Sequence, residues 1–409
     1  MKIAIVCNNL SFITGGPRLA FELARHLGKL GHTVVIYAPD SGGAHFSDVL
    51  GDLDIRVVEA KPTVSRSGGF LGWITAKIRE ERRDVELAKT IAKTMDDDFD
   101  VVNVHDIAYR TGYFYKKRNP NAKVIWQENI PLFVYVKRRK IFHDIVGALY
   151  WILKRFIDRK YYAAIDGVSV LDKLTKKLRE DRGGRNVRII RAGIDFEKFY
   201  APVKSFRRKA AKKEVHLLAV GALNEARRFD NIIEAVRLLR EWGYNARALI
   251  VAHNTWRQDK CRDDLMALIK RYHLEPYVVF RFDGMPELEL VAAFQGADIF
   301  VQAVYAPPPS HQGWGLVNFE AMSAGVPVVL IKSSTAAEVL ADGENVFLFE
   351  PLHPEQIAEK IKFLVDYPEI YDSAARTGQA FVRDNLSWRK FAEEMLSFFE
   401  DIRRLPERR

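Results

Sequence analysis

Residues 311–331, HQGWGLVNFEAMSAGVPVVLI, place two glycines and one glutamate where a strand gives way to a helix. The free N–H groups of a first helical turn near Leu316 carry partial positive charge, and Gly313 and Gly315 let a ligand approach the backbone. This combination predicts an anion site of the phosphate-binding kind. Glu320 lies about 6 Å further along the helix axis, where its carboxylate can accept hydrogen bonds from the hydroxyls of a ribose. The alternative is a glutamate that only complements the helix dipole.

The elements that position this stretch alternate between strand and helix. Short apolar runs at 2–8, 32–39, 55–60, 99–106, 122–128 and 167–171 predict strands, and a run with helical spacing follows the first of them. The alternation restarts at 215–221 and continues through 247–253, 278–282, 298–304 and 326–331. Such alternation is typical of an α/β fold with parallel sheets. Open sheets of this kind bind ligands beyond the carboxyl ends of their strands.

A change in composition divides the chain. Residues 201–214, APVKSFRRKAAKKE, are strongly basic and have no apolar period, which predicts a linker. We therefore expect one Rossmann-like domain at 1–200, a basic linker at 201–214 and a second Rossmann-like domain at 215–375. The helical pattern of 376–409 predicts C-terminal helices that cross back to the first domain. A ligand cleft is expected between the two domains.

The bulk properties are those of a globular protein with an anionic partner. The chain has 409 residues, 48% of them hydrophobic, and a formal net charge of +10, which favours a nucleotide or an anionic membrane surface. Cys7 and Cys261 have no metal-ligand or disulfide spacing, which is typical of a reducing compartment. No apolar run reaches the ~20 residues that span a bilayer. A cytoplasmic protein is expected, with peripheral attachment to the inner face of the membrane left open.

The stretch 312–329 resembles the signature of the retaining GT-B glycosyltransferases of glycosyltransferase family 4. Ten positions are in register, from Gly313, Gly315 and Leu316 through Glu320 to Val329. The segments 2–39, 166–178, 187–202 and 336–351 also resemble this family, so the likeness covers nearly the whole chain. It implies GT-B architecture, with two Rossmann-like domains facing a central cleft.

The resemblance implies roles for the donor side. The helix start at Gly313, Gly315 and Leu316 would take the diphosphate, and Glu320 would take the ribose. The first glutamate of the family signature, which contacts the sugar, is replaced by Gln312, an uncharged residue that still forms hydrogen bonds. Arg227 stands where the family has a lysine on the diphosphate, and arginine can bind phosphate with two hydrogen bonds. Its alternative is a solvated arginine at a helix start.

In the first domain, the glycine loop with Gly15 and Gly16 would approach the diphosphate. Many relatives place a histidine where this chain has Gln127, while His105 matches another family histidine and Asp106 stands beside it. We take Gln127, His105 and Asp106 as the candidate catalytic residues. The Asp-x-Asp spacing within 96–100 is read as a solvated acidic loop, and neither a metal nor a cofactor is expected.

Two basic and aromatic stretches, 67–83 and 136–162, predict an acceptor side that contacts an anionic membrane. Phe70, Trp73, Arg138 and Arg139 are its candidate residues, and a core helix with a charged outer face is the alternative. No nucleic-acid motif accompanies them.

Together these features predict a metal-independent, retaining transferase that moves a hexose-type sugar from a nucleotide sugar, such as a UDP- or GDP-sugar, to a lipid-linked or glycan acceptor. The alternatives are a nucleotide-sugar epimerase of the same fold and an inactive nucleotide-sugar-binding paralogue.

Overall fold

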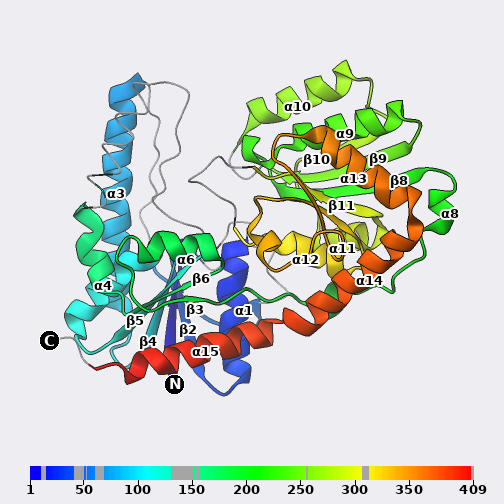
Figure 1. The fold of residues 1–409 in the computed structure, drawn as a ribbon. Helices are drawn as coiled ribbons and strands as arrows, with labels where there is room; N and C mark the ends of the chain where they lie inside the picture. The colour runs from blue at the N-terminus through cyan, green and yellow to red at the C-terminus, as the bar shows by residue number, and fades with distance from the viewer. Residues whose placement is uncertain are drawn as a thin grey trace. The chain divides into compact units, whose positions relative to one another are not determined.

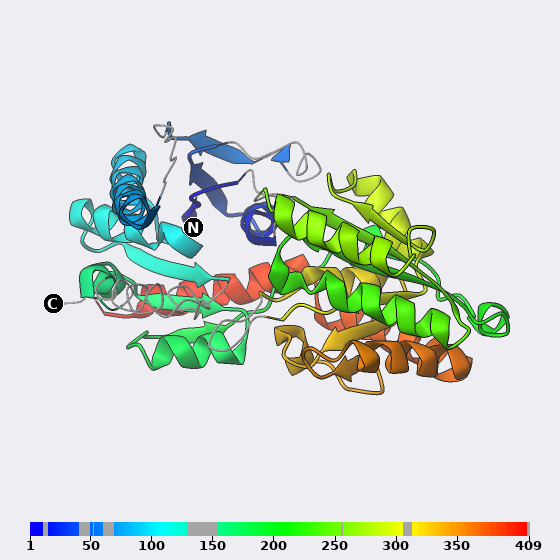
Figure 2. The ribbon, with the colours of Figure 1, turned by 90° about the horizontal axis from the view of Figure 1, so that it is seen from above.

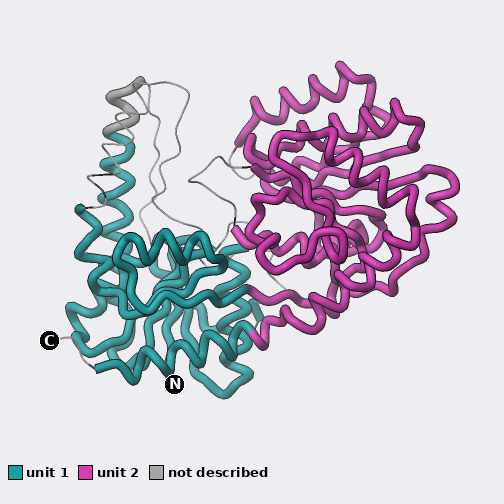
Figure 3. The backbone as a smooth tube through the Cα atoms, viewed as in Figure 1, with its two compact units in different colours: residues 1–191, 391–409 teal, residues 192–390 magenta. Residues whose placement is uncertain are grey.

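The structure is a computed structural model, and it describes residues 1–10, 15–40, 50–51, 53–59, 69–129, 152, 154, 156–254, 257–305 and 313–406, with the backbone alone at 69–74. Two compact units make up the chain, residues 1–191 with 391–409 (unit 1) and residues 192–390 (unit 2), as Figure 3 shows. Each unit is an α/β fold around one parallel sheet (Figure 1).

Unit 1 contains a sheet of seven strands in the order β3-β2-β1-β4-β5-β6-β7. Neighbouring strands run parallel, for example Ala4 opposite Val102 in β1 and β4. The strands are β1 (Lys2–Val6), β2 (Thr33–Ala38), β3 (Asp54–Val57), β4 (Val101–His105), β5 (Lys123–Glu128), β6 (Gly167–Val170) and β7 (Val187–Ile189). The labelled helices of this unit include α1 (Gly15–Lys29), α3 (Gly69–Thr94), α4 (Tyr109–Arg118), α6 (Lys173–Glu180) and α15 (Trp388–Arg404).

Unit 2 contains a sheet of six parallel strands in the order β10-β9-β8-β11-β12-β13. The strands are β8 (Glu214–Ala222), β9 (Asn245–His253), β10 (Val278–Arg281), β11 (Ile299–Gln302), β12 (Val328–Ile331) and β13 (Phe347–Phe349). Its helices include α7 (Phe196–Phe199), α8 (Arg207–Ala210), α9 (Phe229–Glu241), α10 (Asp259–Arg271), α11 (Glu287–Gly296), α12 (Leu316–Ser323), α13 (Pro354–Asp366) and α14 (Pro368–Asn385).

The central strands are buried along their whole length, which requires cover on both faces of each sheet. All residues of β4, β11 and β12 are buried, as continuous apolar runs in a parallel sheet predict. Each unit has a separate hydrophobic core. Trp126 is among the largest buried side chains in unit 1, and Phe349 is among the largest in unit 2. The predicted α/β class with two Rossmann-like sheets is confirmed.

The boundaries between the two units differ from the predicted ones at both points where the chain passes from one unit to the other. The chain leaves unit 1 after Arg191 and returns at Phe391, within α15. Residues 201–214 belong to unit 2 and are not a linker. Phe206 is buried there and stacks on Tyr371 with the ring centroids 4.3 Å apart. Lys209 Nζ donates to the Asp298 carboxylate at 2.7 and 2.9 Å. The basic composition of this segment gave no sign that Phe206 is buried.

Helix α15 completes unit 1. Figures 1 and 2 show its later part, in red, against the strands of unit 1. A Cβ at Gly167, the first residue of β6, would come within 2.7 Å of Ile402 Cδ1 and 2.8 Å of Phe398 Cζ. Arg188 on β7 also pairs with Asp401 at 2.7 Å. The absence of a side chain at Gly167 therefore lets Phe398 and Ile402 of α15 pack directly on the start of β6. Within the described residues, no helix has both the length and the hydropathy to cross a membrane.

Candidate functional site

The strand order of unit 2 locates a candidate crevice. From β8 the chain continues to β9 and β10 on one side of the sheet, and from β11 it continues to β12 and β13 on the other side. The strand order therefore reverses between the neighbouring strands β8 and β11. Ligands bind at such switch points in open α/β sheets. The turn with Arg227 follows β8, and the loop with Gly313 and Gly315 follows β11. The backbone N–H of Tyr305 donates to the Ala226 carbonyl at 2.8 Å and ties the two connections together.

The start of α12 requires a glycine. Gly315 has φ 71°, in the left-handed region, and a Cβ there would lie 2.7 Å from Asn318 Nδ2. Asn318 Nδ2 donates to the Gly315 carbonyl at 3.0 Å and to Gln302 Oε1 at 3.1 Å. This fully buried amide thus holds the turn against the end of β11.

Two further contacts fix the loop before α12. Trp314 is 2% exposed and stacks on Phe319, with ring centroids 5.0 Å apart. The Thr335 hydroxyl donates to the Gly313 carbonyl at 3.1 Å. The tryptophan of the sequence motif is therefore a structural anchor, and the backbone at the helix start is held in place.

Glu320 lies one turn inside α12 and is half-buried. The structure thus places Gly313, Gly315, Leu316 and Glu320 at one end of one helix, as the sequence predicts. Gln312 lies outside the described residues.

Arg227 is a desolvated cation that forms no ion pair with the part of the chain that the structure describes. It ends the 3-10 turn Glu225–Arg227, which Asn224 caps by accepting from the Arg227 backbone N–H at 3.2 Å. Its guanidinium packs on the backbone of Gly221, where a Cβ would meet Nε and Cζ at 3.0 Å. Burial lowers the pKa of Arg227 to about 10. Its Nε is buried with no hydrogen-bond partner among the described residues.

The adjacent Arg228 is a structural residue. Its Nε and Nη2 donate to the two Asp230 oxygens at 2.9 and 2.5 Å, and Nη2 also reaches Asn231 Oδ1 at 3.2 Å. It has φ 51° and precedes α9. The two neighbouring arginines thus differ, because Arg228 is paired with Asp230 and Arg227 is paired with none of the described acidic residues.

In unit 1, the corresponding switch point lies between β1 and β4. Gly15 and Gly16 begin α1, and Asp106 follows β4 with φ 43°. A Cβ at Gly16 would lie 3.4 Å from Asp106 Oδ2 and 3.9 Å from Asn129 Nδ2. The glycine, the carboxylate and the amide therefore meet at the carboxyl edge of the sheet.

The Asp106 carboxylate is held by one residue. Oδ1 accepts from the backbone N–H of Asn129 and Oδ2 from its Nδ2, both at 2.9 Å. The Trp126 indole N–H donates to the Asp106 carbonyl at 2.9 Å. Burial raises the pKa of Asp106 to about 6, although the hydrogen bonds from Asn129 act in the opposite direction.

His105 and Gln127 lie inside the sheet. His105 is 4% exposed, its Nε2 is 2.9 Å from Asn103 Oδ1, and burial lowers its pKa to about 3, so the ring is neutral near pH 7. Gln127 is fully buried and accepts from the Ser169 hydroxyl at 2.6 Å while donating to Asn129 Oδ1 at 3.1 Å. Both ends of its amide are therefore engaged within the protein.

Asn129 is a residue of this site that was not among the predicted site residues. Its position two residues after Gln127 was the available signal, because side chains two apart on an extended segment share a face. Glu128, which lies between them, is bound by Arg179 through Nε at 2.8 Å and Nη2 at 2.5 Å, and is structural.

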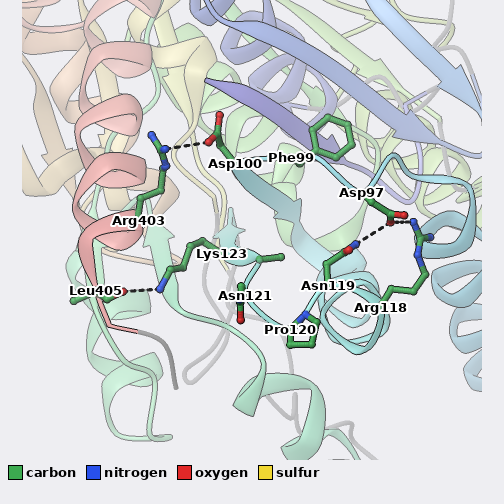
Figure 4. Close-up of a pocket in the computed structure, with 11 residues that line it drawn as sticks. Asp97, Phe99, Asp100, Arg118, Asn119, Pro120, Asn121, Lys123, Arg403 and Leu405 are labelled. Carbon is green, nitrogen blue, oxygen red and sulfur yellow. Dashed lines mark hydrogen bonds and ion pairs between the residues drawn. The ribbon is translucent and has the colours of Figure 1, made fainter. Parts of the chain in front are cut away.

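The acidic residues 96–100 precede β4 and so lie at the amino edge of the sheet, opposite Asp106. Lys2 pairs with Asp96 and Asp98, Arg118 pairs with Asp97, and Arg403 pairs with Asp100. Asp97 and Asp100 border an open cavity of about 570 Å³ whose lining Figure 4 shows. Lys123 in this lining donates to the Leu405 carbonyl at 2.7 Å. The charges that line this cavity are thus paired with one another and with the backbone.

The structure describes no side chain of the four predicted acceptor-side residues. Phe70 and Trp73 lie on α3 at positions where the backbone alone is described, and Arg138 and Arg139 lie outside the described residues. Nearby, Ile152, Phe156 and Ile157 are 54%, 71% and 62% exposed. These three exposed apolar side chains lie in the second of the two predicted stretches.

Comparison with known proteins supplies the family. Residues 13–198 match the family "Glycosyltransferase Family 4" and residues 202–381 match "Glycosyl transferases group 1". The capsular polysaccharide biosynthesis glycosyltransferase CapM of Staphylococcus aureus is 21% identical over 66% of this chain and 70% of its own.

Two solved structures share the fold. A sucrose-phosphate synthase from Thermosynechococcus elongatus superposes with a TM-score of 0.74 at 16% identity, covering 98% of both chains. Anabaena HepE in complex with UDP-glucose superposes with a TM-score of 0.70 at 16% identity, covering 98% of this chain and 100% of that one. Two parallel-sheet units and two family matches, one for each unit, lead to one conclusion: the chain belongs to the group 1, family 4 glycosyltransferases and has the GT-B architecture.

Proposed function

We propose that this glycosyltransferase moves a hexose-type sugar from a nucleoside-diphosphate sugar to an acceptor hydroxyl, with retention and without a metal ion. The observation that carries the proposal is Arg227, a desolvated guanidinium at the switch point of unit 2 that forms no ion pair with the described residues and whose Nε has no hydrogen-bond partner among them. A buried charge is costly unless an opposite charge compensates it. A diphosphate is such a charge, and arginine binds it with two parallel hydrogen bonds.

The donor would lie on unit 2 with each part matched to one group. The diphosphate would contact Arg227 and the free N–H groups at the start of α12, where Gly315 removes the side chain from its path. The ribose would be bound by Glu320, and Gln312 and Gly313 would face the sugar. The UDP-glucose bound by HepE, a protein of the same fold, supports a UDP-sugar as the first donor to test.

The chemistry would rest on stabilising the leaving group. As the bond between the anomeric carbon and the phosphate oxygen breaks, negative charge grows on the diphosphate, and the acceptor oxygen bonds the same face while its proton passes to the phosphate. Fixed positive groups aimed at this charge lower the barrier. Arg227 and the amino end of α12 would supply them, which is why no metal is invoked.

The acceptor would meet unit 1. The exposed Ile152, Phe156 and Ile157 lie in a stretch with eight Lys and Arg residues against two Asp, a pattern that suits an anionic bilayer interface. A cytoplasmic enzyme on the inner face of a membrane, using a lipid-linked or glycan acceptor, fits this surface. Retention on anionic liposomes at low salt and its loss in the Phe156→Ser variant are expected, and failure of the wild type to bind the liposomes would refute the membrane role.

Calorimetric titration with UDP, GDP, ADP and their sugars tests the donor site, with Glu320→Ala expected to weaken binding. Release of the nucleoside diphosphate in the presence of EDTA tests metal-independent transfer. Interconversion of sugar nucleotides without release would instead show an epimerase, and binding without turnover would show an inactive paralogue. If none of these nucleotides binds, the proposal is wrong.

A further inference from the structure

A chain of hydrogen bonds crosses three strands of unit 1 and ends on the Asp106 carboxylate. The Ser169 hydroxyl on β6 donates to Gln127 Oε1 on β5 at 2.6 Å, and Gln127 Nε2 donates to Asn129 Oδ1 at 3.1 Å. Asn129 Nδ2 then donates to Asp106 Oδ2 at 2.9 Å. All three donors point in the same direction, toward the carboxylate.

The chain is sealed from water along most of its length. Ser169 and Gln127 are fully buried, and Asn129 is 7% exposed. Asp106, by contrast, is only half-buried, beside Gly16 at the amino end of α1. Hydrogen bonds aligned in a low-dielectric interior polarise one another, so the last donor is strengthened by those behind it.

Gln127 fixes which end of the Asn129 amide meets Asp106. Because Gln127 Nε2 is a donor, Asn129 must present Oδ1 to it and is left with Nδ2 for the carboxylate. If the amide turned over, Oδ1 would face the negative oxygens of Asp106. The register of β5 and β6 places Gln127 opposite Ser169, which sets the direction at the far end.

We propose that Ser169, Gln127 and Asn129 are positioning residues that hold the Asp106 carboxylate, aimed at the carboxyl edge of the sheet, as the acceptor of a hydrogen bond from a hydroxyl of the sugar acceptor beside the attacking one, whose own proton passes to the phosphate. This inference rests on the proposed function for the identity of that hydroxyl. It also gives Gln127 a different role from the catalytic one expected from its sequence position, because Gln127 acts on substrate only through Asn129 and Asp106.

Three ionisable residues among those described lie close to Asp106: Glu128, Cys7 and His105. Glu128 raises the Asp106 pKa but is bound by Arg179, and the Cys7 thiol at the end of β1 is fully buried. His105, the preceding residue, is neutral. Loss of a titration near pH 6 in Asp106→Asn therefore assigns it to Asp106.

The first test measures the Asp106 pKa by NMR of carboxyl-labelled aspartate, with the signal assigned by Asp106→Asn. Hydrogen bonds to the ionised form lower a pKa, so Asn129→Ala and the near-isosteric Gln127→Met should raise it, by about tenfold in proton affinity. Tyr115→Phe is the matched control, since it removes a buried hydroxyl donor to the Asp96 carbonyl at the opposite edge of the same sheet. An Asp106 pKa that moves no further in Gln127→Met than in Tyr115→Phe overturns the proposal.

The second test separates this inference from the proposed function. Transfer to acceptor should fall about tenfold in kcat/KM in Gln127→Met, with its acid limb moved to higher pH, while UDP affinity stays that of the wild type. Equal transfer by wild type and variant, despite a moved pKa, removes the acceptor role of Asp106. If the wild type itself transfers no sugar, the proposed function falls, and the NMR titration still decides whether the chain holds Asp106.

Discussion

Replacing Arg227 with methionine should change stability and binding in opposite directions. Methionine keeps the length of the side chain over Gly221 but removes its charge. In the free protein, the fall in the Arg227 pKa from 12.5 to about 10 corresponds to about 3 kcal/mol of unfavourable burial. Solvent reaching the half-buried side chain reduces this to about 1–2 kcal/mol. We therefore expect Arg227→Met to raise the free energy of unfolding by about 1 kcal/mol.

The same substitution should weaken nucleotide binding. A hydrogen bond to a charged group contributes about 1.5–3 kcal/mol, so the Kd for UDP should rise about 10- to 100-fold. Urea unfolding without ligand and calorimetric titration with UDP measure the two effects on one sample.

Arg228→Met is the matched control, one residue away and with the same loss of charge. Because Arg228 is paired with Asp230, this variant should lose about 0.5–1 kcal/mol of stability and keep the wild-type affinity for UDP. The reasoning is refuted if Arg227→Met loses as much stability as Arg228→Met, or if it binds UDP as tightly as the wild type.

Three further outcomes are expected. In Gly221→Ala, the new Cβ would lie 3.0 Å from the Arg227 guanidinium and should displace it. Calorimetry should therefore show UDP bound several-fold more weakly, with little change in the melting temperature. Gly315→Ala should cost about 1–3 kcal/mol in urea unfolding, since φ is 71° and the new Cβ would lie 2.7 Å from Asn318 Nδ2; unchanged stability would contradict the left-handed turn. The raised pKa of Asp106, about 6 against 3.8 unfolded, means that the native state holds its proton more tightly. Unfolding free energy should therefore fall by up to about 3 kcal/mol between pH 4 and 6 relative to Asp106→Asn, and equal pH slopes in the two proteins would disprove this.

The alternation of strands and helices was readable from the sequence because buried parallel strands are continuous apolar runs, such as VVNVH in β4. The division between the units was not. The segment 201–214 looks like a solvated linker by composition, yet Phe206 stacking on Tyr371 is a contact between residues 165 positions apart, which no local pattern encodes.

The arrangement of the residues at α12 was predicted better than the surroundings of Asp106, for a related reason. Gly315 and Glu320 lie on one helix, so their spacing along the chain fixes their spacing in space. The surroundings of Asp106 come from three strands and depend on register. The sequence pointed to Gln127 but could not show that Ser169 and Asn129 occupy both ends of its amide.

The return of α15 to unit 1 has a consequence for biosynthesis. Unit 2 is an insertion within unit 1, and its two connections run side by side, because Ile194 pairs with Ser387 and a Cβ at Gly193 would strike the Trp388 backbone. In a nascent chain, Gly167 of β6 therefore lacks its contacts with Phe398 and Ile402 until these two residues leave the ribosome, after all of unit 2 has been translated. The sheet of unit 1 therefore cannot be fully packed until residues more than 200 positions after Gly167 have been synthesised.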